Sequence, residues 1–291
     1  MIHTIENEIL SVSAAEKGGE LASVRRKDTG IEYLWQGDPA YWTGRAYNLF
    51  PICGRLTEGR YTWQGKSYTM GSHGFVRNSP MTLVEHTKDS MTFRLADSEA
   101  TMAEYPFPFV LDVTYTLVEN KLIHRFTVTN TGSEELVFTL GGHPGFNVPL
   151  GENVPFEDWY LEFDEACKPE YIVFSPACLC DGYAPYPLKD DRVMPLRHDL
   201  FDNDAIFLRN AAKGVTLKSD RSAHGVHVAY PDMTHVGVWH KPKTDAPYVC
   251  IEPWYGVPSD DGVVDDFATK RGMLRLAPGA VYSTDMIITL F

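Results

Sequence analysis

The sequence predicts an all-β chain folded as a large antiparallel β-sandwich. Three observations support this: apolar and polar residues alternate with a period of two in several segments, turn residues separate these segments, and no long amphipathic helical pattern occurs. A chain of 291 residues with 44% hydrophobic content is long enough to bury one large core. No Pro/Gly/Ser-rich linker divides it, so a single domain over residues 1–291 is expected.

The first clear strand is "LDVTYTL" at 111–117, where four apolar residues alternate with three polar ones. After a Glu-Asn turn the pattern returns at 121–130, and after a Thr-Gly turn a third strand is predicted at 135–140, which completes a β-meander. Further strands are expected at 91–95, 214–218, 225–230, 235–240, 247–252 and 281–290. Segment 198–207 is expected to hold one or two helical turns.

Composition narrows the class of partner. The formal net charge of −13 argues against nucleic acid and anionic membrane surfaces. No secretory signal pattern is visible, and no stretch approaches the ~18 consecutive apolar residues of a membrane span. The cysteines are Cys53, Cys167, Cys178, Cys180 and Cys250. Their spacing does not complete a zinc motif, so free thiols in a reducing cytoplasm are expected.

Two stretches in the first third of the chain carry candidate binding residues. In "NLFPICGRL", Arg55 follows an apolar run; it is either a surface arginine or a guanidinium fork that binds hydroxyls or a phosphate. In "GSHGFVRN", glycines flank His73, and Phe75 and Arg77 follow. A histidine in a glycine turn is either structural or placed for close approach of a ligand.

Two later stretches carry candidate proton-transfer groups. In "TLGGHPGFN" a strand is expected to end at Leu140, which places His143 at the mouth of a loop, as a turn histidine or as a titratable group facing a substrate. In "VCIEPWYG", Glu252 interrupts an apolar strand and is expected at its end. It either reaches water there or is a desolvated general base beside Trp254, since a buried carboxylate is costly without a partner.

Other chemistries have less support. There is no GxSxG for a serine hydrolase, no HExxH for a metal site, and neither GxGxxG nor GxxxxGK[ST] for a nucleotide. No metal and no cofactor are therefore expected. A retaining glycosidase needs two carboxyl groups, which Asp204 and Glu252 could supply, so that alternative stays open.

Taken together, "FPICGR", "SHGFVR", "GGHPGFNVPL", "LFDNDAIFL" and "CIEPWYGVPSD" resemble, in order, the aldose 1-epimerase (galactose mutarotase-like) superfamily, and within it the bacterial branch typified by the protein encoded beside lactose operons. The resemblance implies the galactose mutarotase-like supersandwich, with no metal or cofactor. It also implies that Glu252 is the catalytic base, His143 the catalytic acid, and His73, Arg55 and Asp204 substrate-binding residues.

The implied reaction interconverts the α and β anomers of a hexose by acid/base ring opening and reclosure. Glu252 would take the proton of the C1 hydroxyl while a protonated His143 supplies one to the ring oxygen. Mutual attraction is expected to stabilise both charges. The expected partner is a small-molecule sugar, and the expected assembly is a monomer or homodimer.

Two alternatives keep the fold. The first is a hexose-6-phosphate 1-epimerase in which Arg55, Arg77 and Lys241 face the phosphate. The second is a non-catalytic sugar-binding protein. Among the aromatic residues, Phe75 and Trp239 are the preferred candidates to contact the sugar. The remaining candidates are Tyr41, Trp42 and Trp254.

Overall fold

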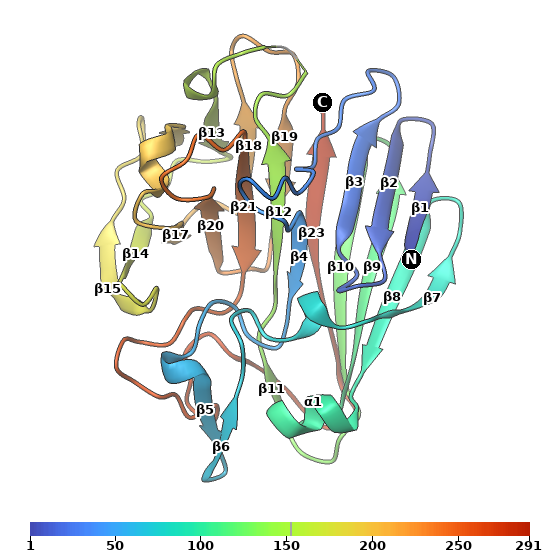
Figure 1. Ribbon diagram of the computed structural model, residues 1–291, viewed down its shortest axis with the longest axis vertical. Helices are drawn as coiled ribbons and strands as arrows, with labels where there is room; N and C mark the ends of the chain where they lie inside the picture. The colour runs from blue at the N-terminus through green and yellow to red at the C-terminus, as the bar shows by residue number, and fades with distance from the viewer. Residues whose placement is uncertain (152) are drawn as a thin grey trace.

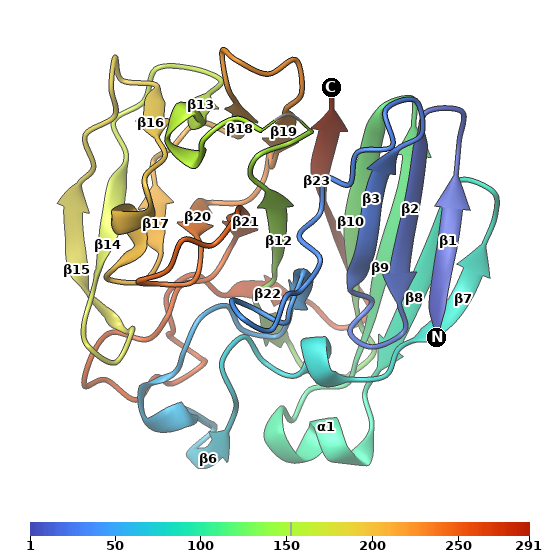
Figure 2. The same ribbon diagram turned by 45° about the horizontal axis from the view of Figure 1, so that its top comes forward.

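The computed structural model describes residues 1–151 and 153–291 and is built from two large antiparallel sheets that lie face to face (Figures 1 and 2). The nine-stranded sheet has the order β16 (Val193–Pro195), β13 (Tyr160–Phe163), β18 (Gly214–Lys218), β19 (Val226–Ala229), β23 (Val281–Leu290), β10 (Lys121–Asn130), β9 (Phe109–Val118), β8 (Ser90–Ala96) and β7 (Thr82–His86). The seven-stranded sheet has the order β15 (Cys180–Pro185), β14 (Glu170–Phe174), β17 (Ile206–Arg209), β20 (His235–Trp239), β21 (Tyr248–Trp254), β12 (Gly141–Asn147) and β4 (Ala46–Leu49).

Smaller elements complete the sandwich. A three-stranded sheet of β1 (Ile2–Glu6), β2 (Leu10–Ala15) and β3 (Leu21–Arg26) lies over β8 to β10 in both views (Figures 1 and 2). Two-stranded sheets are formed by β5 (Arg60–Trp63) with β6 (Lys66–Thr69) and by β11 (Leu136–Phe138) with β22 (Leu274–Leu276). The helical elements are α1 (Glu99–Glu104) and the 3-10 turns η1 (Thr57–Gly59), η2 (Val76–Asn78), η3 (Phe156–Asp158) and η4 (His198–Phe201). Among the described residues, no helix has the length and apolar character needed to cross a membrane.

The two faces of the seven-stranded sheet have different roles. On β21, Val249 and Ile251 join the large core between the sheets, whereas Cys250 and Trp254 belong to two smaller clusters on the opposite face. Successive side chains of a strand point to opposite faces, so this alternation is expected. The residues of the large core are drawn from the chain between Ile5 and Leu290.

The predicted sandwich is confirmed, and so are the strands at 111–117, 121–130, 214–218 and 281–290. The meander is wrong in its third strand. β11 leaves the nine-stranded sheet and pairs with β22, and β23 takes the place beside β10. After Thr131-Gly132 the chain does enter another strand, but this strand is only three residues long and pairs with β22 instead of β10.

Two placements near the candidate site are also corrected. His143 does not sit in a loop mouth: residues 141–147 form β12, a central strand buried on both faces, which hides the alternation that identifies exposed-face strands. Glu252 does not end its strand, because β21 continues through Pro253 to Trp254. Of segment 198–207, only η4 is helical, and the chain enters β17 at Ile206.

His124, on β10, is a titratable group inside the core. It is 2% exposed, packs between Tyr115 and Phe126, and neither ring nitrogen has a hydrogen-bond partner within the described part of the chain. Burial lowers the pKa of His124 to about 3. The unfolded chain, with an ordinary histidine pKa near 6.5, therefore takes up this proton first as the pH falls.

We expect His124→Leu to stabilise the fold at pH 7 by about 1–3 kcal/mol, because it removes two buried, unsatisfied nitrogens. Between about pH 6.5 and pH 3 the wild type should lose up to about 1.4 kcal/mol per pH unit through this group, and the variant should lose less. Urea unfolding across this range measures both effects. A variant that is less stable at pH 7 and equally acid-sensitive would contradict the prediction.

Candidate functional site

A cleft of about 350 Å³ opens on the outer face of the seven-stranded sheet, over β12, β20 and β21. Seven of the eight predicted site residues line it, together with Lys241. They are Arg55, His73, Arg77, His143, Asp204, Trp239 and Glu252. Residues separated by almost 200 positions in the chain thus converge on one concave surface.

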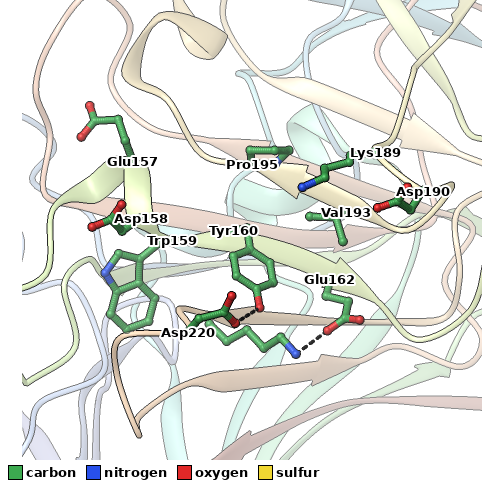
Figure 3. A pocket seen from close by; sticks show the side chains of 11 residues that line it. Glu157, Asp158, Trp159, Tyr160, Glu162, Lys189, Asp190, Val193, Pro195 and Asp220 are labelled. Carbon is green, nitrogen blue, oxygen red and sulfur yellow. Dashed lines mark hydrogen bonds and ion pairs between the residues drawn. The ribbon is translucent and has the colours of Figure 1, made fainter.

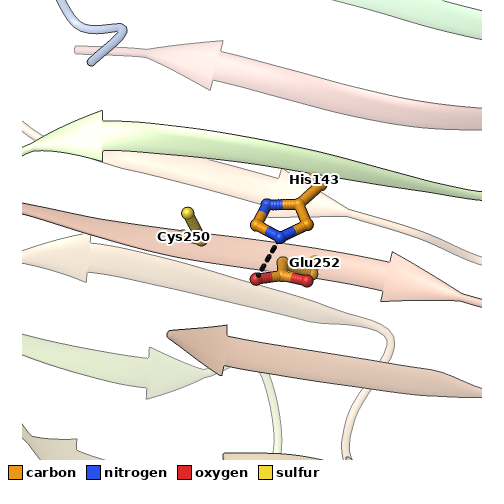
Figure 4. Close-up of side chains that lie close together, drawn as sticks. All are labelled: His143, Cys250 and Glu252. Carbon is orange, nitrogen blue, oxygen red and sulfur yellow. Dashed lines mark ion pairs between the residues drawn. The ribbon is translucent and has the colours of Figure 1, made fainter. Parts of the chain in front are cut away.

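The floor of the cleft is the pair His143 and Glu252, which face each other across β12 and β21. Nε2 of His143 lies 3.3 Å from Oε1 of Glu252, and the two residues are 8% and 2% exposed (Figure 4). The recorded register, with Gly141 opposite Trp254 and Gly145 opposite Cys250, places them directly opposite each other.

Two prolines flank this pair within central strands. The backbone nitrogens of a strand point alternately to its two sides. Because the N–H of Gly145 donates toward β4, the nitrogen of Pro144 faces β21. Because the N–H of Tyr255 donates to Leu140, just before β12, the nitrogen of Pro253, two residues earlier, also faces β12. Each proline removes a donor from the same ladder. The pair between them occupies a position without ladder hydrogen bonds, where opposing side chains come closest in an antiparallel sheet.

Glycines on the same face make the cleft concave. A Cβ at Gly141 would lie 2.5 Å from the Trp254 ring, and one at Gly237 would lie 2.7 Å from the Phe207 ring. Gly237 is also the β20 neighbour of Glu252. Aromatic rings therefore fold down over the strands beside the carboxylate, which explains how a sheet surface buries an ionisable pair.

Burial disfavours the charged form of both His143 and Glu252. It raises the pKa of Glu252 well above its usual range, with Asp204 adding to the effect, and it lowers the pKa of His143 to about 3. The expectation that mutual attraction keeps both groups charged is therefore not supported by these shifts, because burial disfavours the charged form of each group. A neutral carboxyl beside a neutral imidazole holds the same single proton as the ion pair, so the two forms differ only in where that proton lies.

His73 is held as a neutral hydrogen-bond donor. The N–H of Gly54 donates to its Nδ1 at 3.2 Å, which assigns the ring proton to Nε2. Burial lowers the pKa of His73 well below its usual value, and the neighbouring His143, Arg77 and Arg55 reinforce the shift. The ring packs edge-on against His143 and Trp254, so its free N–H belongs to the cleft.

A buried ion pair fixes the backbone of Arg55 from behind. Nζ of Lys270 lies 3.0 Å from Oδ2 of Asp265, and Ser259 donates its hydroxyl to the same carboxylate at 2.5 Å. The N–H of Ser259 then donates to the carbonyl of Arg55 at 2.9 Å. Pro258 packs so closely over Gly54 that a Cβ there would lie 2.7 Å away.

Phe75 is the predicted site residue that does not line the cleft. It is 8% exposed and packs in the core beside Phe50, Tyr105 and Phe109. Gly74 has φ of +70° and lies so close to the Phe50 carbonyl that no Cβ fits there. This close contact of the two backbones directs Phe75 into the core. The sequence does not show whether Phe75 points into the core or into the cleft.

Several aromatic residues that line the cleft are not among the preferred candidates from the sequence. Tyr41, Trp42 and Trp254 do line the cleft, and so do Tyr47, Phe174 and Phe207, which the sequence did not single out. The available signal was the cluster of aromatics at 41–47 beside an arginine. In an all-β chain this signal is weak because most aromatic residues are core residues.

The same floor holds the one group of potential metal ligands found in the described residues. Ligand atoms of His143, Cys250 and Glu252 lie within 4.8 Å of one another (Figure 4). Nitrogen, thiolate and carboxylate donors suit zinc. A metal held by this trio would engage the same imidazole and carboxylate that face each other at 3.3 Å.

A second hollow, of about 390 Å³, lies over β13, β16 and β18 and contains none of the predicted residues (Figure 3). Glu162 pairs there with Lys218, Asp158 pairs with Arg221, and Asp220 accepts a hydrogen bond from Tyr160 at 2.6 Å, while Glu157 and Asp190 also line the hollow. The pair of a histidine and a carboxylate lies in the first cleft, which is therefore the candidate site.

Comparison with known proteins identifies the family of this chain. A sequence model described as aldose 1-epimerase matches residues 1–289. The chain belongs to the aldose 1-epimerase family. Among curated relatives of this aldose 1-epimerase family member, the chromosomal protein LacX of Lactococcus lactis subsp. lactis is 36% identical over 263 residues, which is 87% of each chain.

Solved structures of similar proteins extend the match to the whole fold. A galactose mutarotase related enzyme from Lactobacillus acidophilus superposes with a TM-score of 0.95 at 37% identity, over 100% of this chain and 97% of that one. A galactose mutarotase-like protein from Lactobacillus casei superposes with a TM-score of 0.94 at 30% identity, over 100% of both chains. The supersandwich expected for the family is thus the fold of this aldose 1-epimerase family member.

We expect Lys270→Met to lower the free energy of unfolding by about 3–5 kcal/mol, because it leaves the Asp265 carboxylate buried without its partner. In the folded fraction, the KM for sugar should rise more than kcat falls, since Arg55 loses its anchor. Urea unfolding and saturation kinetics measure the two effects. Lys270→Arg, which keeps the charge, is the control, and unchanged stability of Lys270→Met would refute the account.

Chelation offers a separate test of the cleft floor. If His143 and Glu252 act without a metal, excess EDTA should leave the epimerase activity unchanged and added Zn²⁺ should inhibit it. Cys250→Ser should keep its activity and weaken the inhibition. Loss of activity in EDTA that Zn²⁺ restores would show instead that the trio is a working metal site.

Proposed function

We propose that this protein is an aldose 1-epimerase that interconverts the α and β anomers of a free aldohexose. The observation that carries the proposal is the 3.3 Å approach of His143 Nε2 to Glu252 Oε1 on the floor of the cleft. A cleft of about 350 Å³ lies at the small end of ligand pockets, which run from about 300 to 1,000 Å³, and suits a single sugar ring.

The proposed reaction has two proton transfers at one site. The Glu252 carboxylate accepts the proton of the C1 hydroxyl while protonated His143 donates to the ring oxygen, and the C1–O5 bond breaks to give the open-chain aldehyde. Rotation about C1–C2 presents the other carbonyl face. Closure then reverses both transfers: O5 attacks C1, Glu252 returns its proton to O1, and His143 takes the proton from O5.

The electrostatics of the pair fit this cycle. Ring opening begins with a carboxylate and an imidazolium and ends with a carboxylic acid and a neutral imidazole. Burial favours the second arrangement, so the proton positions that accompany the open chain are the ones that the cleft stabilises. The starting form is reached by moving one proton between Glu252 and His143, without exchange with solvent.

The surrounding residues would hold the sugar in place. His73 offers an N–H donor beside His143, Arg55 a guanidinium fork, and Asp204 a carboxylate acceptor, all on the walls of the same cleft. Trp239 and Trp42 supply apolar walls against which the C–H face of a sugar ring can pack. Each of these groups can hydrogen-bond to a sugar hydroxyl or pack against a sugar ring.

This arrangement also bears on the rival chemistries. A retaining glycosidase would place a second carboxyl group about 5–5.5 Å from Glu252; Asp204 lines the same cleft, but the group 3.3 Å from Glu252 is an imidazole, which that mechanism does not use. A non-catalytic sugar-binding protein needs no buried acid and base, and burying them is costly. Both observations favour an epimerase.

A hexose 6-phosphate is the second candidate substrate. Arg55, Arg77 and Lys241 line the cleft, and none of them forms an ion pair with another described residue, although the chain carries an excess of acidic groups. Unpaired cations in one cleft suit an anionic substituent. Rates with glucose and glucose 6-phosphate, measured in the same assay, decide between the two substrates.

Glu252→Gln should fold and bind sugar but lose mutarotation by about 10²- to 10⁴-fold, because the amide cannot accept the C1 hydroxyl proton. Polarimetry of freshly dissolved α-glucose and α-galactose measures the rate, and a sugar-induced thermal shift checks binding. Glu85→Gln, on the exposed strand β7, is the matched control. Near-normal rates in Glu252→Gln would remove the proposed base from the mechanism.

A further inference from the structure

Two histidines that contact each other take no part in the proposed proton transfers. Nδ1 of His198, in η4, lies 3.1 Å from Nε2 of His240, the residue that follows β20. His240 is fully buried, whereas His198 is partly exposed. Both neighbours of His240 in the chain, Trp239 and Lys241, line the cleft, so the histidine pair lies directly behind its wall. A polar ring at this buried position requires partners for both of its nitrogens.

The neighbours of His240 fix the direction of this hydrogen bond. Nδ1 of His240 lies 2.8 Å from the carbonyl oxygen of Lys241, which can only accept, so Nδ1 carries the ring proton and Nε2 is an acceptor. Nδ1–H of His198 therefore donates to Nε2 of His240. Burial lowers the pKa of His240 to about 4, so this ring is neutral at pH 7 and both of its nitrogens are satisfied.

Aromatic packing fastens the whole of η4 to this buried ring. Phe201 packs against His240 with ring centroids 4.3 Å apart, and Phe156 stacks on His198 at 4.0 Å. His198 is the first residue of η4 and Phe201 is the last. His240 thus contacts both ends of this short helical turn, which fixes the turn to the chain that leaves β20.

The turn fixed in this way leads directly to Asp204 on the wall of the cleft. The N–H of Asp204 donates to the carbonyl of Phe201 at 3.0 Å, and the backbone of Asp204 has φ of +80°. This left-handed conformation is costly for a residue other than glycine and persists only where the surrounding structure imposes it. β17 then begins at Ile206, which pairs with Val238 of β20. Asp204 and His240 therefore lie at the same end of this pair of strands.

We propose that the hydrogen bond between His198 and His240 is a clamp that holds Asp204 in the geometry in which its carboxylate faces the sugar. Both histidines are then positioning residues. The inference rests on the proposed function, in which Asp204 accepts hydrogen bonds from sugar hydroxyls. Without the clamp, the backbone of Asp204 can relax to negative φ, and only the fraction of molecules that keeps the left-handed conformation binds sugar fully.

Removing the clamp should weaken sugar binding more than it slows the chemical step, because His143 and Glu252 lie on other strands. His198→Ala removes the donor and changes no residue that lines the cleft. We expect the KM for glucose and galactose to rise by about three- to tenfold, the range that corresponds to one neutral hydrogen bond, while kcat stays within about twofold. Polarimetry at a series of sugar concentrations gives both constants.

Matched variants separate positioning from a general loosening of η4. His198→Asn places an amide N–H near the position of Nδ1 and should return KM to within about twofold of the wild type. Asp199→Ala removes the ion pair with Arg197 on the exposed side of the same turn and leaves the clamp in place, so its KM should also stay within about twofold. If His198→Ala is unstable, His198→Leu repeats the test, because it keeps an apolar contact with Phe156 but has no donor.

The outcomes distinguish the clamp from the proposed function. An unchanged KM in His198→Ala, a rise that Asp199→Ala reproduces, or a rise that His198→Asn does not reverse would overturn the clamp. Absence of mutarotation in the wild type would instead refute the proposed function. The clamp is then judged by the Kd for the same sugars in calorimetric titration, which His198→Ala should raise by the same factor. An unchanged Kd in that variant, or no sugar binding by the wild type, would overturn it.

Discussion

The site depends on one constraint. A histidine and a glutamate are buried together at a non-hydrogen-bonded pair of β12 and β21, where neither residue bonds to the other's backbone. His143 and Glu252 face each other between two prolines, each of which removes a donor from the ladder that joins β12 and β21. The loss of those donors is a local cost. The rest of the sheet is regular enough to offset it, and the result is a pair fixed by backbone geometry rather than by long, mobile side chains.

Much of the surrounding molecule serves that pair. Glycines at 141 and 237 allow the Trp254 and Phe207 rings to fold down beside it, and these rings exclude water from the floor. Exclusion of water is what moves the two pKa values in opposite directions. The polar groups on the walls of the cleft are held separately, His73 by the backbone of Gly54 and Arg55 by the loop behind it.

The sequence predicted the fold class and the strands that alternate clearly, because alternation survives where one face of a strand is solvated. It failed at β12, where both faces are buried and glycines replace the usual apolar residues, and His143 was consequently expected in a loop. Its candidate site residues converge on the cleft except for Phe75, whose direction is set by a close contact between Gly74 and Phe50. The sequence also could not predict which aromatic residues face the cleft, because that depends on how neighbouring strands pair.

The division of β21 into two faces has a consequence for how this family can vary in length. Glu252 faces the cleft and Ile251 faces the core only because each lies at a fixed count from the pairing with β12 and β20. One inserted residue within Tyr248–Trp254 would turn the carboxylate inward and an isoleucine outward. Insertions and deletions should therefore be excluded from this strand, whereas the loops around the cleft can lengthen without shifting the register of Glu252.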